Sequence, residues 1–156
     1  MKTLIKDQIS GVWRRPRVLL ADDHLAVVEG MKRLLFAAYD LLPPVGDGQV
    51  LVEVAERMGP DVIIADISMP RVSGIEAARQ ITRRGLKSKI IVQSMHTEPE
   101  WAIQAFAAGA SGYVLKQSAA EELRRAIEDV LRNKTYISPS VRKHRGHSFP
   151  FLAAAS

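Results

Sequence analysis

The sequence contains no cysteine among its 156 residues. This absence excludes disulfide bonds and thiolate metal sites, and it fits a reducing compartment without demonstrating one. The sequence also lacks an apolar run of about 18 residues, the length that a membrane-spanning helix needs. Its first residues have no apolar run of signal-peptide length. We therefore expect a soluble, cytoplasmic protein that does not associate with membranes.

Positive charge is scarce in the middle of the chain, although the whole sequence has a net charge of +5. Residues 18–131 contain 12 basic and 16 acidic residues, whereas residues 1–17 carry a net +4 and residues 132–156 a net +5. We interpret the two basic ends as solvated tails and not as a nucleic-acid surface. The predicted organisation is a basic N-terminal extension at 1–16, one domain at 17–141 and a short disordered tail at 142–156.

Short apolar runs alternate with amphipathic helical patterns along the predicted domain. The runs are 17–21, 41–45, 61–66, 89–93 and 113–115, and the helical patterns are 24–38, 47–58, 73–84, 97–108 and 118–131. Proline cannot donate to a strand ladder, so Pro43 and Pro44 assign the second run to a sheet edge. Strict alternation predicts an α/β fold, a doubly wound parallel sheet with helices on both faces.

Polar residues follow four of the predicted strands at the point where each ends. They are the pair Asp22 and Asp23, then Asp66, Ser94 and Lys116. Taken alone, Asp66 fits a turn residue as well as a site residue, and the acidic pair could cap a helix. The carboxyl ends of parallel strands meet at one rim, where ligands bind in open α/β sheets. The convergence of these groups favours a site.

Three carboxylates in one crevice repel one another unless a cation offsets their charge, and one lysine is too few. Oxygen ligands of this kind suit Mg²⁺. An ion held by Asp23, Asp66 and the backbone carbonyl of Ser68 would leave an Asp66 oxygen free as a nucleophile. Lys116 and Ser94 would then stabilise a phosphoryl group during its transfer to Asp66.

The chain from 17 to 141 resembles the receiver domain of bacterial two-component response regulators, most closely the NarL and FixJ (LuxR-type) group. The stretch D-I-S-M-P-x-x-x-G, which starts at Asp66, carries much of this resemblance. The resemblance implies a flavodoxin-like (βα)5 fold with strand order 2-1-3-4-5. It also implies roles for the residues at the rim: Asp66 as phosphoacceptor, Asp23 as direct and Asp22 as outer-sphere Mg²⁺ ligand, Ser94 as switch hydroxyl, Lys116 as the family's lysine and Tyr113 as the aromatic that turns inward.

The resemblance further implies a phosphorylation-activated switch of a phosphorelay, with a sensor histidine kinase as phosphoryl donor and transcription regulation as the usual setting. Its output would be a protein contact, including a homodimer through the face of the fourth helix, fifth strand and last helix. It would not be an enzyme beyond self-phosphorylation and slow autodephosphorylation. Gln117 follows Lys116 where many receivers have proline, a variant that we associate with the NarL and FixJ group.

Three alternatives remain beside this interpretation. The chain could be the receiver half of a truncated DNA-binding regulator, because relatives continue after a segment like 135–139 into a helix-turn-helix domain. Residues 142–156 are too few for such a domain, so we expect no direct DNA binding. A phosphatase of the haloacid dehalogenase type also uses an aspartate nucleophile with Mg²⁺, but it needs a D-x-D motif, and here Asp22, Asp23 and His24 follow the first strand. A phosphorylation-independent interaction module is disfavoured because no site residue is missing.

Overall fold

The computed structural model describes residues 3–142. The predicted disordered tail, apart from Arg142, lies outside the described residues. No helix between residues 3 and 142 combines the length and the apolar character that crossing a bilayer requires.

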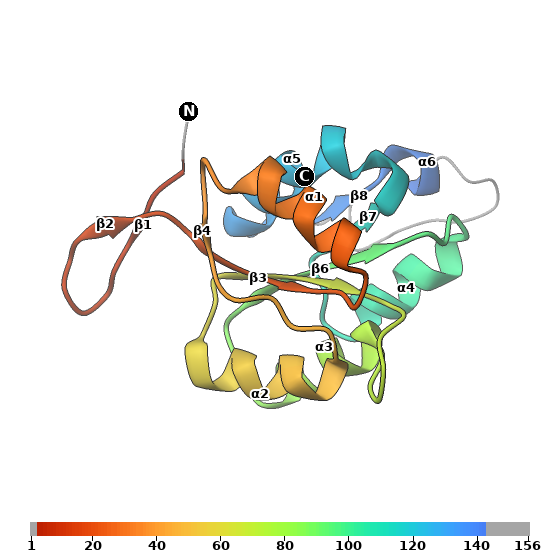
Figure 1. Cartoon of the computed structure of the whole chain (residues 1–156), viewed down its shortest axis with the longest axis horizontal. Helices are drawn as coiled ribbons and strands as arrows, with labels where there is room; N and C mark the ends of the chain where they lie inside the picture. The colour runs from red at the N-terminus through yellow and green to blue at the C-terminus, as the bar shows by residue number, and fades with distance from the viewer. Residues whose placement is uncertain (1–2, 143–156) are drawn as a thin grey trace.

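A six-stranded parallel sheet forms the centre of the molecule, with the order β4-β3-β5-β6-β7-β8 (Figure 1). Its strands are β3 (Arg17–Ala21), β4 (Asp40–Leu41), β5 (Val62–Asp66), β6 (Lys89–Ser94), β7 (Gly112–Leu115) and β8 (Tyr136–Ile137). The first five strands have the predicted flavodoxin-like order, so the fold prediction is confirmed. Strand β4 lies on the edge, as Pro43 and Pro44 indicated. Its predicted extent of 41–45 was wrong, because the strand covers Asp40–Leu41 and Val45 adds only an isolated bridge to Ala21.

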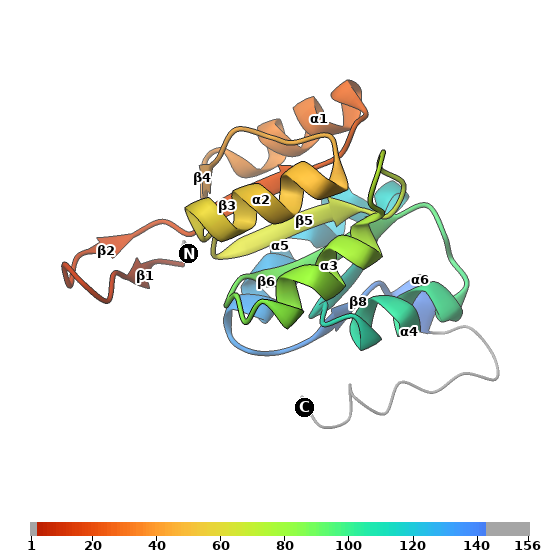
Figure 2. The ribbon, with the colours of Figure 1, turned by 90° about the horizontal axis from the view of Figure 1, so that it is seen from below.

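Helices cover both faces of the sheet, as Figure 2 shows. They are α1 (Leu25–Leu35), α2 (Gly48–Met58), α3 (Gly74–Arg83), α4 (Pro99–Ala107) and α5 (Ala119–Leu131), with the short 3-10 helix η1 (Lys116–Ser118) before α5 and α6 (Pro139–Arg142) at the end. Helices α1 and α5 pack on one face, and α2, α3 and α4 pack on the other.

Strand β5 is buried along its whole length, which explains its unbroken run of apolar residues before Asp66. Side chains alternate along a strand, so Ile63 and Ala65 join the core under α2, α3 and α4. Val62 and Ile64 join the core under α1 and α5. Asp66 therefore lies at the end of a central strand that is held on both faces by the core.

Side-chain caps hold the start of some helices and not of others. Ser73 accepts a hydrogen bond from the backbone N–H of Glu76 at the start of α3. Neither α4 nor α5 has a side-chain hydrogen bond at its N-cap residue. Leu25, the first residue of α1, has 75% of its surface exposed and so lies outside the core.

The sheet continues one strand further than the sequence predicted. Strand β8 pairs in parallel with β7, and the buried hydroxyl of Ser138 accepts from the backbone N–H of Leu115 and donates to Glu122 of α5. Helix α6 then packs against α4. The face of α4, β7 and α5, which we predicted as a dimer contact, is thus partly covered by the chain's own residues 136–142.

Residues 5–14 of the N-terminal extension form regular structure, so their interpretation as a solvated tail was wrong. Strands β1 (Ile5–Lys6) and β2 (Trp13–Arg14) form an antiparallel hairpin that projects from one end of the molecule (Figures 1 and 2). A bidentate ion pair fixes its base, because Arg14 reaches both oxygens of Asp61 at 2.7 and 3.1 Å.

Candidate functional site

The carboxyl-end rim of the sheet brings together the polar residues that the sequence singled out. Asp22 and Asp23 follow β3, Asp66 ends β5 and Lys116 follows β7. Each residue is placed by a strand of the central sheet and not by a long loop, so their relative positions are fixed by strand pairing. The rim is therefore a preorganised site.

Lys116 connects the two buried carboxylates of the rim. Its Nζ lies 3.0 Å from Asp22 Oδ2 and 3.1 Å from Asp66 Oδ2, and each of the two aspartates is only 4% exposed. Burial raises the pKa of Asp66, Lys116 lowers it, and the neighbouring charge of Asp22 raises it again, so that the net shift is upward. Burial alone would lower the pKa of Lys116, but hydrogen bonds and charge from Asp22 and Asp66 raise it. Lys116 therefore stays charged at neutral pH.

His24 belongs to this site, although the sequence analysis gave it no role there. Its Nδ1 lies 2.9 Å from Asp22 Oδ1, 3.2 Å from Asp23 Oδ1 and 3.8 Å from Asp66 Oδ2. The backbone N–H of His24 also donates to Asp22 Oδ1 at 2.8 Å. Its position directly after the acidic pair was the available signal, but only the turn between β3 and α1 shows that the ring faces three carboxylates.

The donor set fits a hard divalent cation. Ligand atoms of Asp22, Asp23, His24 and Asp66 all lie within 4.8 Å of one another. Three carboxylates and one lysine leave an excess of negative charge, and carboxylate oxygens are preferred ligands of Mg²⁺. The exposed Asp23 gives the cluster access to solvent. The carboxylates of Asp22, Asp23 and Asp66 are therefore chemically suited to hold a divalent cation such as Mg²⁺.

Addition of Mg²⁺ should shift the NMR signals of the His24 ring, because the imidazole now contacts the oxygens that would hold the ion. His96 provides an internal control, because it lies outside the cluster. In a Mg²⁺ titration, the His24 signals should saturate together with the backbone amides of Asp23 and Asp66. An unchanged His24 signal, with shifts elsewhere, would place the cation at another site.

A second group of contacts connects Ser94 and Tyr113 through the loop after β6. The backbone N–H of His96 donates to Ser94 Oγ at 2.9 Å, and Tyr113 Oη donates to the carbonyl of His96 at 2.7 Å. Tyr113 is fully buried, so its ring lies inward. Burial raises the pKa of Tyr113 to about 12, which keeps the hydroxyl protonated as a donor. The predicted switch residues therefore meet at one loop.

The turn after Asp66 completes the site. The backbone N–H of Ser68 acts to lower the pKa of Asp66 and so supports its ionised form. Gly74 closes the turn, because its N–H donates to the carbonyl of Ile67 at 2.9 Å. A Cβ at Gly74 would lie only 2.1 Å from the backbone oxygen of Asp66. The last residue of the D-I-S-M-P-x-x-x-G motif thus permits the close packing of α3 on the end of β5.

Comparison with known proteins agrees with this arrangement. The family described as "Response regulator receiver domain" matches residues 18–128. The chain is 36% identical over 127 residues to the transcriptional regulatory protein DegU of Brevibacillus brevis, covering 80% of this chain and 54% of that protein. It is 30% identical over 126 residues to the nitrate/nitrite response regulator protein NarL of Escherichia coli, covering 80% and 58%. The chain therefore spans little more than half the length of these curated relatives.

Solved structures give the same result. A two-component response regulator of the LuxR family from Aurantimonas sp. superposes with a TM-score of 0.78 at 32% identity, covering 90% of this chain and 96% of that one. The receiver domain of the putative response regulator NarL from Mycobacterium tuberculosis gives a TM-score of 0.72 at 30% identity, covering 77% and 98%. The strand order, the acidic rim and these matches agree, and the chain belongs to the response regulator receiver domain family.

Proposed function

We propose that this chain is a phosphorylation-activated switch of a two-component phosphorelay and that Asp66 accepts the phosphoryl group. The observation that carries the proposal is the position of Asp66: it is 4% exposed, ends a central strand and lies 3.1 Å from the ammonium group of Lys116. A turn-capping aspartate would have no need of a neighbouring lysine or of two further carboxylates. The phosphoryl donor is a sensor histidine kinase or a small acyl phosphate.

In the transfer, a carboxylate oxygen of Asp66 attacks phosphorus. The new O–P bond forms as the N–P bond of a phosphohistidine breaks, and the imidazole leaves with the electron pair of that bond. Lys116 stabilises the negative charge of the transferred phosphoryl group, because its Nζ lies 3.1 Å from Asp66 Oδ2. When bound by Asp23, Asp66 and the Ser68 carbonyl, Mg²⁺ supplies positive charge that offsets the negative charge of the phosphoryl oxygens.

Signal output begins at the loop after β6. A phosphoryl group on Asp66 attracts the Ser94 hydroxyl, which then donates a hydrogen bond to it. This movement of the Ser94 hydroxyl weakens the hydrogen bond that the backbone N–H of His96 donates to Ser94 Oγ. The His96 carbonyl also accepts a hydrogen bond from the hydroxyl of Tyr113, a residue of β7. Movement of this loop therefore changes a contact of β7. The readout is a protein contact on or beside α4, β7 and α5, including dimerisation, and it requires residues 136–142 to adjust.

In this role the chain is a signalling component and not an enzyme that turns over a substrate. Its relatives DegU and NarL are a transcriptional regulatory protein and a response regulator by name, and a role in transcription control follows for this chain through a partner or a further domain. The cytoplasm is the compartment in which a kinase would reach it.

Incubation with Mg²⁺ and acetyl phosphate should add one phosphoryl group per chain, detectable by intact-protein mass spectrometry and lost at alkaline pH as acyl phosphates are. Peptide mapping after borohydride reduction should place it at Asp66. A phosphatase of the haloacid dehalogenase type would instead hydrolyse p-nitrophenyl phosphate for many turnovers. Sustained turnover of that ester without a stable adduct would replace the switch proposal with the phosphatase.

A further inference from the structure

Strand β6 carries one polar side chain that the core leaves without a partner. Gln93 is only 2% exposed, and its Oε1 is buried with no hydrogen-bond partner among the residues that the structure describes. Side chains alternate along a strand, so Gln93 points to the same face as Ile91, the face that α1 and α5 cover. A buried amide oxygen without a donor costs free energy, so such a group needs an explanation. The phosphoryl transfer proposed above does not use it.

Gln93 lies at the floor of a hollow between α1 and α5, which we call the α1–α5 hollow. Its volume is about 510 Å³, within the range of about 300–1,000 Å³ that is usual for small-molecule sites. Small or aliphatic side chains form much of its lining, among them Ala26, Gly30 and Leu34 of α1 and Ala119 of α5. A Cβ at Gly30 would meet nothing within 4 Å, so the space is open. Gln93 can therefore be reached only by a group that enters between the two helices.

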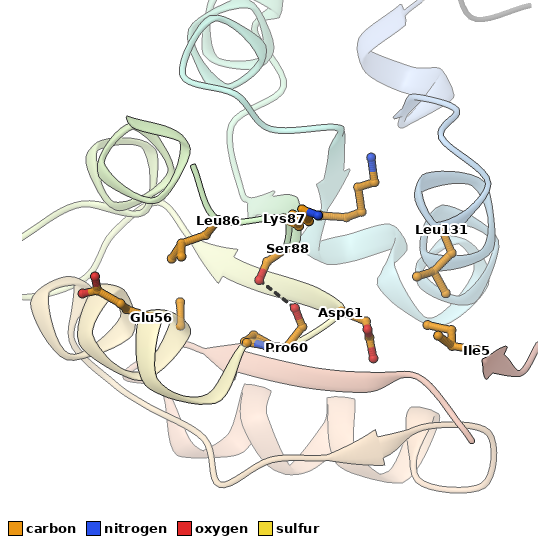
Figure 3. A pocket seen from close by; sticks show the side chains of 11 residues that line it. Ile5, Glu56, Pro60, Asp61, Leu86, Lys87, Ser88 and Leu131 are labelled. Atoms are coloured by element: carbon orange, nitrogen blue, oxygen red, sulfur yellow. Dashed lines mark hydrogen bonds between the residues drawn. The ribbon is translucent and has the colours of Figure 1, made fainter. Parts of the chain in front are cut away.

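The polar groups of a second hollow, by contrast, are already paired. This hollow lies at the opposite edge of the sheet, where β5 and β6 begin, and has a volume of about 270 Å³. Figure 3 shows Ser88 pointing to Pro60, and the Ser88 hydroxyl donates to the Pro60 carbonyl at 2.6 Å. Asp61, which also lines this hollow, pairs with Arg14 at 2.7 Å. A buried amide that lacks a partner thus distinguishes the α1–α5 hollow.

We propose that the α1–α5 hollow binds a small neutral ligand that has an apolar body and a carboxamide or lactam group. The ligand N–H donates to Gln93 Oε1, and the ligand carbonyl accepts from Gln93 Nε2. An amide matches both groups of the Gln93 side chain, whereas a hydroxyl would donate to its oxygen alone. The small and aliphatic walls of the hollow bury the apolar body of the ligand.

The charges at the hollow favour a neutral ligand. Arg33 and Lys116 are the charged residues among those that line it, so a cation would be repelled. Lys116 is already held by Asp22 and Asp66, at 3.0 and 3.1 Å. A carboxylate ligand has no hydrogen to donate to Gln93 Oε1, and it would leave that buried oxygen unpaired. An uncharged N–H donor meets both conditions.

Benzamide is a suitable probe, because it combines an apolar ring with a carboxamide. In an NMR titration of the full chain, the methyl signal of Met31, which lines the hollow, should shift to saturation. The methyl signal of Met58, on the other face of the sheet, should not move. For a ligand of this size we expect a dissociation constant between about 0.1 mM and about 10 mM. Methyl benzoate has the same ring but no N–H, so it should bind at least about fivefold more weakly.

Three variants locate the site. Gln93→Leu removes the amide and should weaken benzamide binding at least about fivefold. Gln49→Leu is the matched control, because it makes the same change at an exposed position of α2, and it should bind within about twofold of the wild type. Gly30→Phe should fill the hollow from the exposed side of α1 and prevent binding, which tests the site even if Gln93→Leu fails to fold.

Binding is measured on the unphosphorylated chain, so the result does not depend on whether Asp66 accepts a phosphoryl group. The proposal is overturned if the Met31 signal does not move at about 20 mM benzamide, if methyl benzoate binds as tightly as benzamide, or if Gln93→Leu binds benzamide as the wild type does. A Met31 signal that shifts with protein concentration alone would instead assign the hollow to a second copy of the chain.

Discussion

Replacing Asp66 with asparagine should abolish phosphoryl uptake and at the same time stabilise the fold. The amide cannot act as the nucleophile, so no adduct should appear with Mg²⁺ and acetyl phosphate at any time point. Asp40→Asn is the matched control, because Asp40 is an exposed aspartate at the start of β4, away from the rim. It should take up phosphoryl groups at the wild-type rate. Uptake by the Asp66→Asn chain would move the acceptor to another residue.

The stability gain has a separate physical origin. Burial and the charge of Asp22 raise the pKa of Asp66 in the folded state, in spite of Lys116. A carboxyl with a raised folded pKa binds its proton more tightly in the folded chain than in the unfolded one. Folding stability from this group therefore falls as pH rises through that pKa, and ionised Asp66 costs stability at pH 7. Asparagine of similar shape has no such cost, and Lys116 keeps its contact with Asp22.

Urea unfolding in metal-free buffer should measure this gain. At pH 7 the Asp66→Asn chain should unfold at a higher urea concentration than the wild type. The difference in urea midpoint between the two chains should narrow as pH falls toward 3.8, the ordinary pKa of an aspartate carboxyl. Asp66 of the wild type becomes protonated in this range and is then uncharged, as asparagine is. A variant less stable than the wild type at pH 7 would show that Lys116 overcompensates the repulsion. The two readouts together separate loss of function from loss of fold.

The sequence predicted the central sheet because its strands are buried runs and its helices have an apolar face. Strand β5 is one such run, and the edge position of β4 followed from Pro43 and Pro44 with the family resemblance. Strand β8 was missed because Tyr136 and Ile137 are too few to show a period. The hairpin was missed for the same reason, although the turn residues Asp7 and Gly11 between its strands were a usable signal.

The site was predictable as a set of strand ends, and its contacts were not. Parallel topology alone brings Asp22, Asp66 and Lys116 to one rim, so their meeting follows from the order of strands and helices. The contact of His24 with three carboxylates depends on the turn before α1, and the bond from Tyr113 to the His96 carbonyl depends on a loop path. Local pattern cannot encode such contacts, because they are decided by packing.

Gly74→Ala should destabilise the protein by about 3 kcal/mol, at the upper end of what overpacking costs. The new Cβ would lie 2.1 Å from the backbone oxygen of Asp66 and 2.8 Å from its carbonyl carbon, and backbone atoms cannot turn aside as a side chain can. Either α3 or the end of β5 must move, so the chain that remains folded should also accept phosphoryl groups more slowly.

Gly30→Ala is the matched control for this prediction. Gly30 lies inside α1, and a Cβ there would meet nothing within 4 Å. Alanine in the middle of a helix is favoured over glycine by about 0.5–1 kcal/mol, so this variant should be more stable than the wild type. The same substitution should thus shift the urea midpoint in opposite directions at the two positions. Equal shifts would mean that α3 does not pack on Asp66 as closely as described, and the rigid delivery of the phosphoacceptor by β5 would have to be reconsidered.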